Sequence, residues 1–555
     1  MVRATFSGFN TALSALQANQ KRLDITGQNL SNMNTAGYTR QQLEASSLNY
    51  TNPVSHYSNG NETAVGFGVS MDRVSQIRDP YLDIQYRSQS ADCSYTNRLQ
   101  TALNSLSKVL DETTISGIRQ AFDDVQSTLT SMQDPAKVSD PIYESELRTK
   151  MQSVCNLFNQ ASRQITQAEQ NEFQRLTGEG SSEQGDVQKI NDILRQIGDL
   201  NVQIKRNQVA GHPSLELQDE RNLLLDELSG YIPVETRYYK DDAHSGNNAY
   251  DYDANGAVIG KKDWPDDLEV SMNYIDAQGK SQKLILVNGS DLGADGLTKN
   301  YGQLSVLNRD HQPAASVSDP ANISIKFEKA PSYQVNGQAA TDVYAELKGI
   351  HFEGGSLQAS LDMLQKKGTG NVINGSVDDV RGYQYYSEKL DQLDDTFAKS
   401  MNASNNGNNH KDQNLLSNST DDTTTGITAG NIGISKGWTS GTIHISTDGT
   451  NRTDTILDMI AAMKDTKKLN GKTFADYMNN LSTQLASDSS SNQTALKTGT
   501  TVLNSIQDSR DSLSGVSLDE EATNMMAYVS AYNAASRLMT ALDEVLNTLI
   551  SNTGA

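Results

Sequence analysis

The pattern in this chain that most resembles a ligand site is a short acidic run. Asp251, Asp253 and Asn255, followed by Gly256, repeat the opening of a calcium-binding loop. Such a loop needs a bidentate glutamate at its twelfth position, where this chain has Lys262. Because a lysine ammonium repels the metal, we interpret the run as a turn between two strands and expect no calcium there.

The other residues that could do chemistry are scattered. No two of the seven histidines lie within ten residues of each other, and the His-Glu-x-x-His pattern of zinc sites does not occur. Phosphate-binding loops of the Walker and Gly-x-Gly-x-x-Gly types are missing as well. We therefore expect no catalytic residue, no cofactor and no metal, and predict that the protein is not an enzyme.

Composition narrows the class of protein further. The 555 residues are enough for several domains, and the net charge of −22 disfavours binding to phosphate backbones. The sequence has no run of 18 apolar residues, so we expect no membrane span. Near the N-terminus, Thr5, Ser7 and Asn10 interrupt the apolar stretch that a signal peptide would need. Cys93 and Cys155 lie in helical patterns; we expect unpaired thiols, although a disulfide stays open.

The two ends of the chain share one pattern, an apolar stripe with alternating steps of three and four residues that is typical of a coiled coil. The N-terminal stripe consists of Phe6, Phe9, Leu13, Leu16, Leu23 and Leu30. The C-terminal stripe consists of Met525, Val529, Tyr532, Met539, Leu546 and Ile550. Polar or small residues interrupt both, at Gln20 and Gly27 and at Ser536 and Asp543. The stripes predict two long helices that form an assembly interface, although periodicity alone allows an ordinary intramolecular core.

Between the ends, the texture of the sequence predicts an α+β multidomain protein. We expect a terminal helical domain from residues 1–65 with 505–555, and a helical bundle from 66–230 with 355–401 and 456–504. Residues 231–354 show short alternating runs and predict an inserted, β-rich outer domain. Residues 402–455 are rich in Asn, Gly, Ser and Thr and predict an insertion with short strands. We expect the last helical block to break near residues 487–491.

The start of the last helix is the best-marked boundary. Ser517, Asp519 and Glu520 form the pattern of a capping box, in which the Ser517 hydroxyl accepts from the Glu520 N–H and the Glu520 carboxylate reaches back to Ser517. Negative charge in this first turn also favours the positive end of the helix dipole.

Two stretches at opposite ends resemble the signatures of bacterial flagellar axial proteins. The first runs from Asn29 through Asn34 to Gly37-Tyr38-Thr39-Arg40-Gln41, and the second from Ser514 to Glu521. The Gly-Tyr-Thr-Arg-Gln ending resembles the flagellar hook-associated protein 1 family. Its members join the hook to the filament. We predict a signature turn at Asn29, Asn34, Gly37, Tyr38, Arg40 and Gln41.

The resemblance implies a secreted subunit of the flagellum at the hook–filament junction. It implies export by the flagellar type III apparatus, a dedicated export chaperone on the last helix, and a ring of copies whose terminal helices line the inner tube. Its neighbours would be the hook protein and the next hook-associated junction protein. It implies neither nucleic-acid binding nor membrane insertion. A hook or distal rod protein is the alternative, and a secreted enzyme or adhesin carried by residues 231–350 is a remote one.

Overall fold

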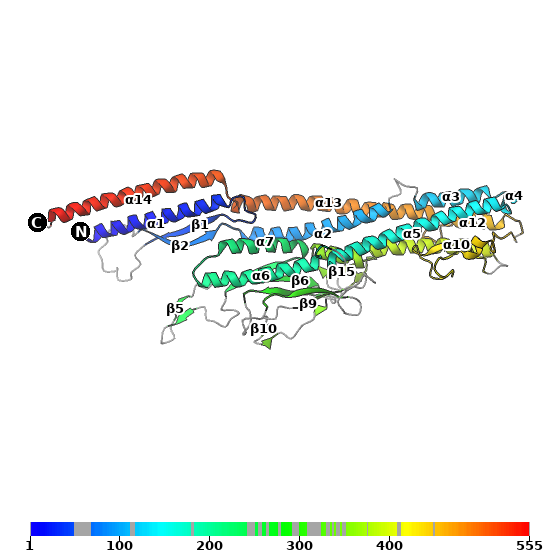
Figure 1. Cartoon of the computed structure of the whole chain (residues 1–555), viewed down its shortest axis with the longest axis horizontal. Coiled ribbons are helices and arrows are strands. Elements are labelled where there is room, and N and C mark those ends of the chain that lie inside the picture. The colour runs from blue at the N-terminus through cyan, green and yellow to red at the C-terminus, as the bar shows by residue number, and fades with distance from the viewer. Residues whose placement is uncertain are drawn as a thin grey trace.

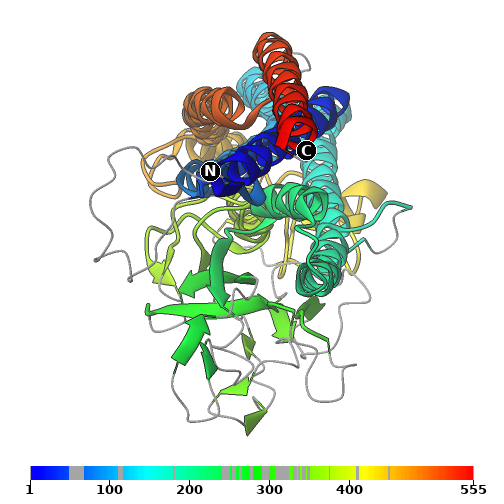
Figure 2. The same cartoon turned by 90° about the vertical axis from the view of Figure 1, so that its left-hand side faces the viewer.

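A computed structural model describes residues 2–48, 68–110, 117–178, 182–240, 250–252, 258–261, 266–275, 279–290, 299–307, 324–328, 334–335, 338–339, 345–346, 351–373, 376–407, 412–447 and 450–553. The molecule is an elongated rod of helices with its β structure on one flank, and both termini lie at the same end (Figures 1 and 2). The calcium-like run is only partly inside the described residues.

The end that carries the termini consists of two long helices and a hairpin. Helix α1 (Val2–Ser31) lies beside α14 (Leu518–Thr553). Helices in proteins gain most of their stability by packing an apolar face against a partner, and these two supply that partner to each other. Strands β1 (Gln41–Ser47) and β2 (Val69–Gln76) pair antiparallel, from Gln41 opposite Gln76 to Ser47 opposite Val69, and pack on α1. The expected domain boundary at 65/66 falls inside this hairpin.

The rod is a bundle of helices, and most of the β structure on its flank is inserted between two of them, α7 and α9. Its described helices are α2 (Pro80–Leu110), α3 (Ile118–Ser131), α4 (Pro135–Val138), α5 (Pro141–Thr177), α6 (Asp186–Val209), α7 (Leu215–Tyr231), α9 (Ser356–Gln365), α10 (Tyr383–Asn406), α11 (Lys436–Ser440), α12 (Asp454–Lys464) and α13 (Phe474–Ser514). Local chemistry sets several ends. Asp134 and Asp140 each cap a helix that begins with proline, and Gly178 ends α5 with a φ of +77°.

Helix α13 runs unbroken through residues 487–491, so the predicted break there is wrong. The serine-rich stretch has weak intrinsic helix propensity, but its side chains find partners on neighbouring helices. The Gln100 amide donates to the Ser489 hydroxyl at 2.8 Å, and Arg381 pairs with Asp488 at 2.7 Å. Tertiary contacts therefore hold a helix that the local sequence does not favour.

The β structure on the flank consists of small antiparallel sheets. The largest centres on β6 (Asp266–Ile275), which pairs with β3 (Glu235–Lys240), β7 (Ser281–Asn288) and β13 (His351–Phe352). A second joins β8 (Gln303–Leu307), β9 (Ser324–Glu328) and β12 (Ala345–Glu346). The remaining described pairs are β4 (Tyr250–Tyr252) with β5 (Val258–Lys261), β10 (Gln334–Val335) with β11 (Gln338–Ala339), and β14 (Val372–Ile373) with β15 (Ser376–Val377).

The Asn- and Gly-rich stretch 402–455 packs into the bundle. Strands β16 (Leu416–Asn418) and β17 (Ile432–Ile434) pair, and Trp438 of α11 is fully buried. The Trp438 indole donates to Glu144 on α5 at 2.8 Å. This stretch therefore closes one end of the rod's core.

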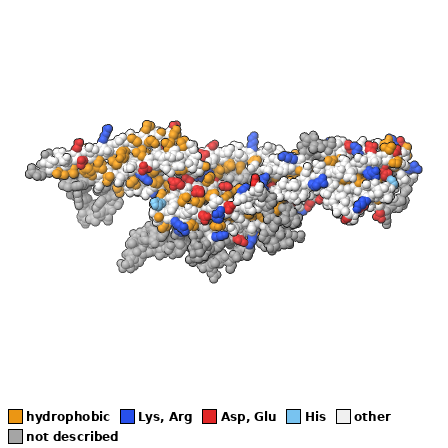
Figure 3. Space-filling model, viewed as in Figure 1, with side chains coloured by type: hydrophobic (Ala, Val, Ile, Leu, Met, Phe, Trp, Pro, Cys, Tyr) orange, Lys and Arg blue, Asp and Glu red, His pale blue; other side chains and the backbone are white. Residues whose placement is uncertain are grey.

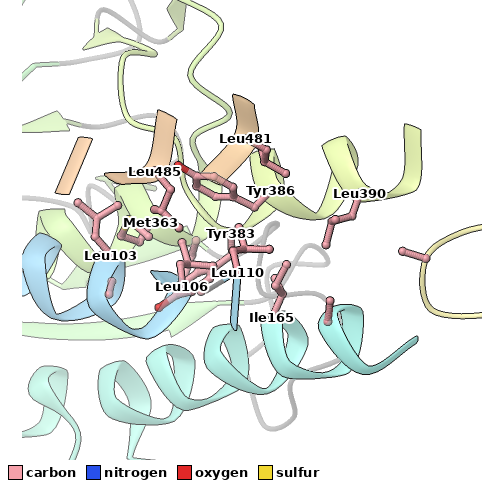
Figure 4. Packing of buried hydrophobic residues seen from close by; sticks show 14 of the residues in the cluster. Leu103, Leu106, Leu110, Ile165, Met363, Tyr383, Tyr386, Leu390, Leu481 and Leu485 are labelled. Atoms are coloured by element: carbon pink, nitrogen blue, oxygen red, sulfur yellow. The ribbon is translucent and has the colours of Figure 1, made fainter. Parts of the chain in front are cut away.

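The buried hydrophobic side chains of the rod and of the sheets form one continuous cluster. Figure 4 shows a part of it, in which Leu103, Leu106 and Leu110 of α2 lie near Tyr383 and Tyr386 of α10. Phe122, Phe397 and Phe474 pack ring against ring with centroids 5.1–5.6 Å apart. Cys93 and Cys155 are both buried and unpaired. The architecture confirms the predicted class: an α+β chain with paired long terminal helices, a helical bundle and inserted β structure.

Candidate functional site

Helix α14 meets α1 through a heptad seam. The α14 positions that α1 covers alternate in steps of three and four: Met525, Tyr528, Tyr532, Ala535, Met539, Leu542 and Leu546. Two contacts define the facing side of α1. A Cβ on Gly8 would lie 3.4 Å from Leu542, and the Arg22 guanidinium stands 5.6 Å from the centre of the Tyr528 ring. The two termini therefore form a coiled-coil-like pair within one chain.

The predicted C-terminal stripe and this seam share every second position along α14. Met525, Tyr532, Met539 and Leu546 lie in it and are half-buried. Val529 and Ile550 lie outside it and are 43 % and 61 % exposed. At the positions between them, the buried residue lies one position before the predicted one. Ala535 and Leu542 are therefore in the seam, in place of the polar Ser536 and Asp543 of the predicted stripe.

The predicted N-terminal stripe is partly covered. Phe9, Leu16, Leu23 and Leu30 are half-buried, Leu13 is 45 % exposed, and the side chain of Phe6 lies outside the described residues. The fully buried positions of α1 occupy two faces: one directly beside the predicted stripe, with Ala12, Asn19 and Thr26, and one on the opposite side of the helix, with Ala18, Ile25 and Asn29. One of these faces meets the hairpin, where the Ser14 hydroxyl accepts from the Val69 N–H at 3.2 Å. Whether the two stripes also meet other subunits stays a prediction.

The signature turn is built around Asn29. Its side-chain oxygen accepts from the Tyr38 hydroxyl at 2.9 Å and from the Gln41 N–H at 3.0 Å, and its amide donates to the Gln41 carbonyl. Gly37 has a φ of +78°, a conformation that favours glycine, and Asn34 is exposed in the turn. One buried asparagine therefore folds the chain back from α1 into β1.

Arg40 connects this turn to the start of α14. Its guanidinium pairs with Glu520 at 2.6 Å and with Glu521 at 2.9 Å, and its N–H donates to the Ser514 carbonyl. Ser517 caps the helix, since its hydroxyl accepts from the Glu520 N–H at 3.5 Å. The Glu520 carboxylate points to Arg40, so the predicted bond back to Ser517 is replaced by an ion pair. Asp519 is exposed in the first turn.

Further arginine–carboxylate pairs tie the turn to the rod. Arg510 of α13 pairs with Asp83 of α2 at 3.0 Å and with Asp226 of α7 at 2.8 Å. Asp219 of α7 accepts from the Thr39 N–H at 3.0 Å, and Arg78 stands 3.9 Å from it. The residues that form the junction network, as we call it below, are Arg40, Arg78, Arg510, Asp83, Asp219, Asp226, Glu520 and Glu521.

Burial shifts the acidity of two groups in this region. Burial raises the pKa of Asp219 to about 6, although the bonds from Thr39 and the charge of Arg78 act in the opposite direction. Burial also raises the pKa of the Tyr38 hydroxyl, with smaller contributions from Glu216, Asp219 and Glu521. Tyr38 therefore stays neutral and keeps donating to Asn29.

A cavity of about 700 Å³ lies beside the junction network. The signature turn, α2 and α7 line it on one side, and the last turns of α13 and the linker from Gly515 to Ser517 line the other. Both connections between the terminal helices and the rod thus run past one polar cavity. This arrangement fixes how the α1–α14 pair is set on the rod, which is a mechanical role.

Most of the junction network could not be found from the sequence. Asp83, Asp219, Asp226 and Arg510 come from three different helices, and nothing in their local spacing distinguishes them from surface charges. Glu521 was recognisable only as a favourable charge at a helix start.

Other chemistry has little support among the described residues. There, no group of three or more His, Cys, Asp or Glu could hold a metal ion. Residues Gly433–Gly437 have the Gly-x-Ser-x-Gly spacing of a hydrolase nucleophile, and Ser435 lies between the end of β17 and the start of α11. Ser435 has an ordinary φ of −63°, and its buried hydroxyl accepts from the Trp438 N–H. It is therefore a helix cap. Within the described parts of the chain, no helix has the length and apolar character of a membrane span.

Comparison with protein families finds three matches along the chain. The model described as "Flagellar hook-associated protein FlgK helical domain" matches residues 103–262. "Flagella basal body rod protein" matches residues 9–39, and "Flagellar basal body rod FlgEFG protein C-terminal" matches residues 509–552. The last two matches cover most of α1 and α14 and the signature turn as far as Thr39.

Whole-chain relatives agree with these matches. The chain is 29 % identical over 571 residues to flagellar hook-associated protein 1 of Bacillus subtilis, with 99 % of each chain covered. It is 23 % identical to flagellar hook-associated protein 1 of Escherichia coli, covering 98 % of this chain and 99 % of the relative. A solved structure titled as the flagellar hook junction protein FlgK from Burkholderia pseudomallei aligns over 61 % of this chain and 45 % of its own, with a TM-score of 0.36 and 17 % identity. On the sequence relatives and the family matches, the chain is similar over its whole length to flagellar hook-associated protein 1.

Proposed function

We propose that the chain is a secreted structural subunit of the bacterial flagellum that polymerises at the tip of the hook and joins the hook to the filament. The names of its relatives support a place in the flagellum. The observation that carries the proposal is an apolar surface that the folded chain leaves open on α14.

This surface, which we call the outer stripe, consists of Ala527, Ala531, Ala534, Leu538, Ala541 and Val545. All six are exposed, follow the alternating three-four spacing, and lie one residue, or about 100°, from the seam that α1 covers. Hydrophobic side chains gather over the α1–α14 end in the view of Figure 3. A continuous apolar stripe this long on an isolated chain indicates a partner surface.

A second copy of the chain is the partner that fits best. Alanine at four of the six positions allows two helix backbones to approach closely, and every copy carries the same stripe. A ring of copies would cover each outer stripe with a neighbouring terminal helix. The exposed residues of the predicted stripes, Leu13, Val529 and Ile550, would then add to the same contacts.

The remaining partners follow from the same proposal. The hook protein and the next hook-associated junction protein would contact the ring above and below. Before export through the flagellar type III apparatus, a dedicated chaperone would cover α14, because its open stripe would otherwise promote aggregation. The role is structural, without catalysis, nucleic-acid binding or membrane insertion.

Truncation in cells tests the proposal. Deletion of residues 1–40 or 515–555 should leave hooks intact on the cell while filaments fail to attach and flagellin accumulates in the medium. The control is deletion of residues 241–249, which leaves the sequence of the terminal helices unchanged. Cells that carry this deletion should swim. Normal filaments on either terminal deletion would refute the junction role.

A hook or distal rod protein is the second candidate, since the two rod-protein matches cover both terminal helices. Electron microscopy of a null strain separates the two. Loss of a junction protein leaves complete hooks, whereas loss of a hook or distal rod protein removes the hook itself.

A further inference from the structure

The core of the rod contains a buried acidic side chain, Asp394, which takes no part in the contacts of the terminal helices. Asp394 lies on α10, one turn from Phe397, and is fully buried. Neither of its carboxylate oxygens has a hydrogen-bond partner among the described residues. An ionised carboxylate in such a position is strongly unfavourable, and the usual response is to take up a proton.

The groups on α10 that face Asp394 increase this effect. Asp391 and Asp395 are both acidic and repel a charge on Asp394. Asp395 is already paired with Lys399 at 2.7 Å, and Asp391 accepts from the Ala429 N–H at 2.8 Å. Lys399 is therefore already paired with Asp395, and neither neighbouring aspartate offsets a negative charge on Asp394.

The elements packed against α10 supply no compensating charge either. From α5 the facing titratable group is the buried thiol of Cys155, whose own pKa is raised by burial and by Asp394. Strand β16 and residues 427–434 contain no titratable side chain. The charged residues of the other neighbours lie outside the buried core or have partners: Asp454, Asp458 and Lys464 on α12, Asp362 with Lys366 on α9, and Asp488 of α13 with Arg381.

We propose that Asp394 is a proton-dependent weak point of the helical bundle: the folded chain holds its carboxyl protonated, and the bundle loses stability as the pH rises. Burial and the two neighbouring aspartates raise the pKa of Asp394 to about 8. In the unfolded chain an aspartate has a pKa of about 3.9.

The sign follows from proton linkage. Between the two pKa values the folded state binds more protons than the unfolded state, so stability falls as the pH rises from about 4 to about 8. Each pH unit inside this window lowers the ratio of folded to unfolded chain by up to about tenfold. If the chain is exported unfolded, which rests on the proposed function, this weak point makes the bundle easier to open at neutral and alkaline pH.

Urea unfolding of the full chain tests the inference at pH 5 and pH 8.5, in the wild type, in Asp394→Asn and in Asp395→Asn. The second variant is the matched control, since it neutralises the adjacent carboxylate that Lys399 already pairs. We expect the wild-type midpoint to fall at pH 8.5, Asp394→Asn to raise the midpoint there and remove most of the pH dependence, and Asp395→Asn to keep it.

An unchanged pH dependence in Asp394→Asn, or a lower midpoint than the wild type at pH 8.5, would overturn the inference. If Asp394→Asn does not fold, proton uptake on refolding at pH 6.5 decides: uptake of about one proton per chain in both the wild type and Asp395→Asn supports the inference, and no net uptake in either refutes it. Neither measurement depends on swimming. A negative result here would leave the junction proposal unaffected, and a failure of the junction proposal would leave the pH dependence of the bundle unaffected.

Discussion

Replacing Glu521 by glutamine should loosen the start of α14 while leaving the rod unchanged. Glu521 is 2 % exposed and holds the Arg40 Nε at 2.9 Å, whereas Glu520, the other partner of Arg40, is 60 % exposed. Glutamine keeps the shape of the side chain, so the substitution changes the charge and little else. The expected loss therefore measures how strongly the signature turn is tied to the last helix.

The magnitude follows from two contributions. Exchanging a charge-assisted hydrogen bond for a neutral one costs about 1 kcal/mol. Losing a negative charge from the first turn of the helix costs about 0.3–1 kcal/mol more. The sum, about 1–2 kcal/mol, corresponds to roughly 5- to 30-fold faster opening of the first turns of α14.

Hydrogen exchange of peptides from residues 518–530, measured on the full chain by mass spectrometry, reads this opening directly. Glu520→Gln is the matched control, because an exposed ion pair contributes about 0–1 kcal/mol and less in high salt. We expect Glu521→Gln to exchange clearly faster than Glu520→Gln, also in 1 M salt. Equal or faster exchange in the control would refute the reasoning.

Three further outcomes follow from other parts of the structure. Because the folded-state pKa of Asp219 is raised to about 6, the wild type should lose up to about 3 kcal/mol of stability as the pH rises from about 4 to 6. Asp219→Asn should remove this loss, and urea midpoints measured across the range check it. Gly499→Cys should form a disulfide with Cys93 under oxidation, since a Cβ at residue 499 would lie 3.2 Å from the Cys93 sulfur, and peptide mapping without reductant detects it. Phe397→Ala should cost about 3–5 kcal/mol in thermal or urea unfolding, whereas Tyr81→Ala, at a 64 % exposed position, should cost little.

The sequence predicts those parts of the molecule that depend on local pattern. Heptad spacing and the cap at Ser517 indicate the two terminal helices, and the change from helical to alternating periodicity indicates the β structure on the flank. The phase of the α14 seam is harder, because Val529 and Tyr528 are both apolar and only the position of α1 decides which of them is covered.

Features that depend on distant partners could not be predicted. The serine-rich part of α13 reads as a break until Gln100 and Arg381 are brought beside it. The junction network has the same origin, since Arg510 meets Asp83 and Asp226 only after three helices have packed together. Asn29 and Arg40 were within reach because they lie in a recognisable signature, although their partners were not.

The central claim is that the outer stripe of α14 carries subunit contacts, and a charge placed on it in living cells tests this most directly. Leu538→Asp with Val545→Asp changes two exposed positions of the stripe; Ser536→Asp with Asn547→Asp adds the same charge to exposed polar positions of the same helix. Circular dichroism should show that both purified variants keep the helical content of the wild type. Electron microscopy of cells should then show bare hooks with the stripe variant and complete filaments with the control. Complete filaments with the stripe variant would contradict the account.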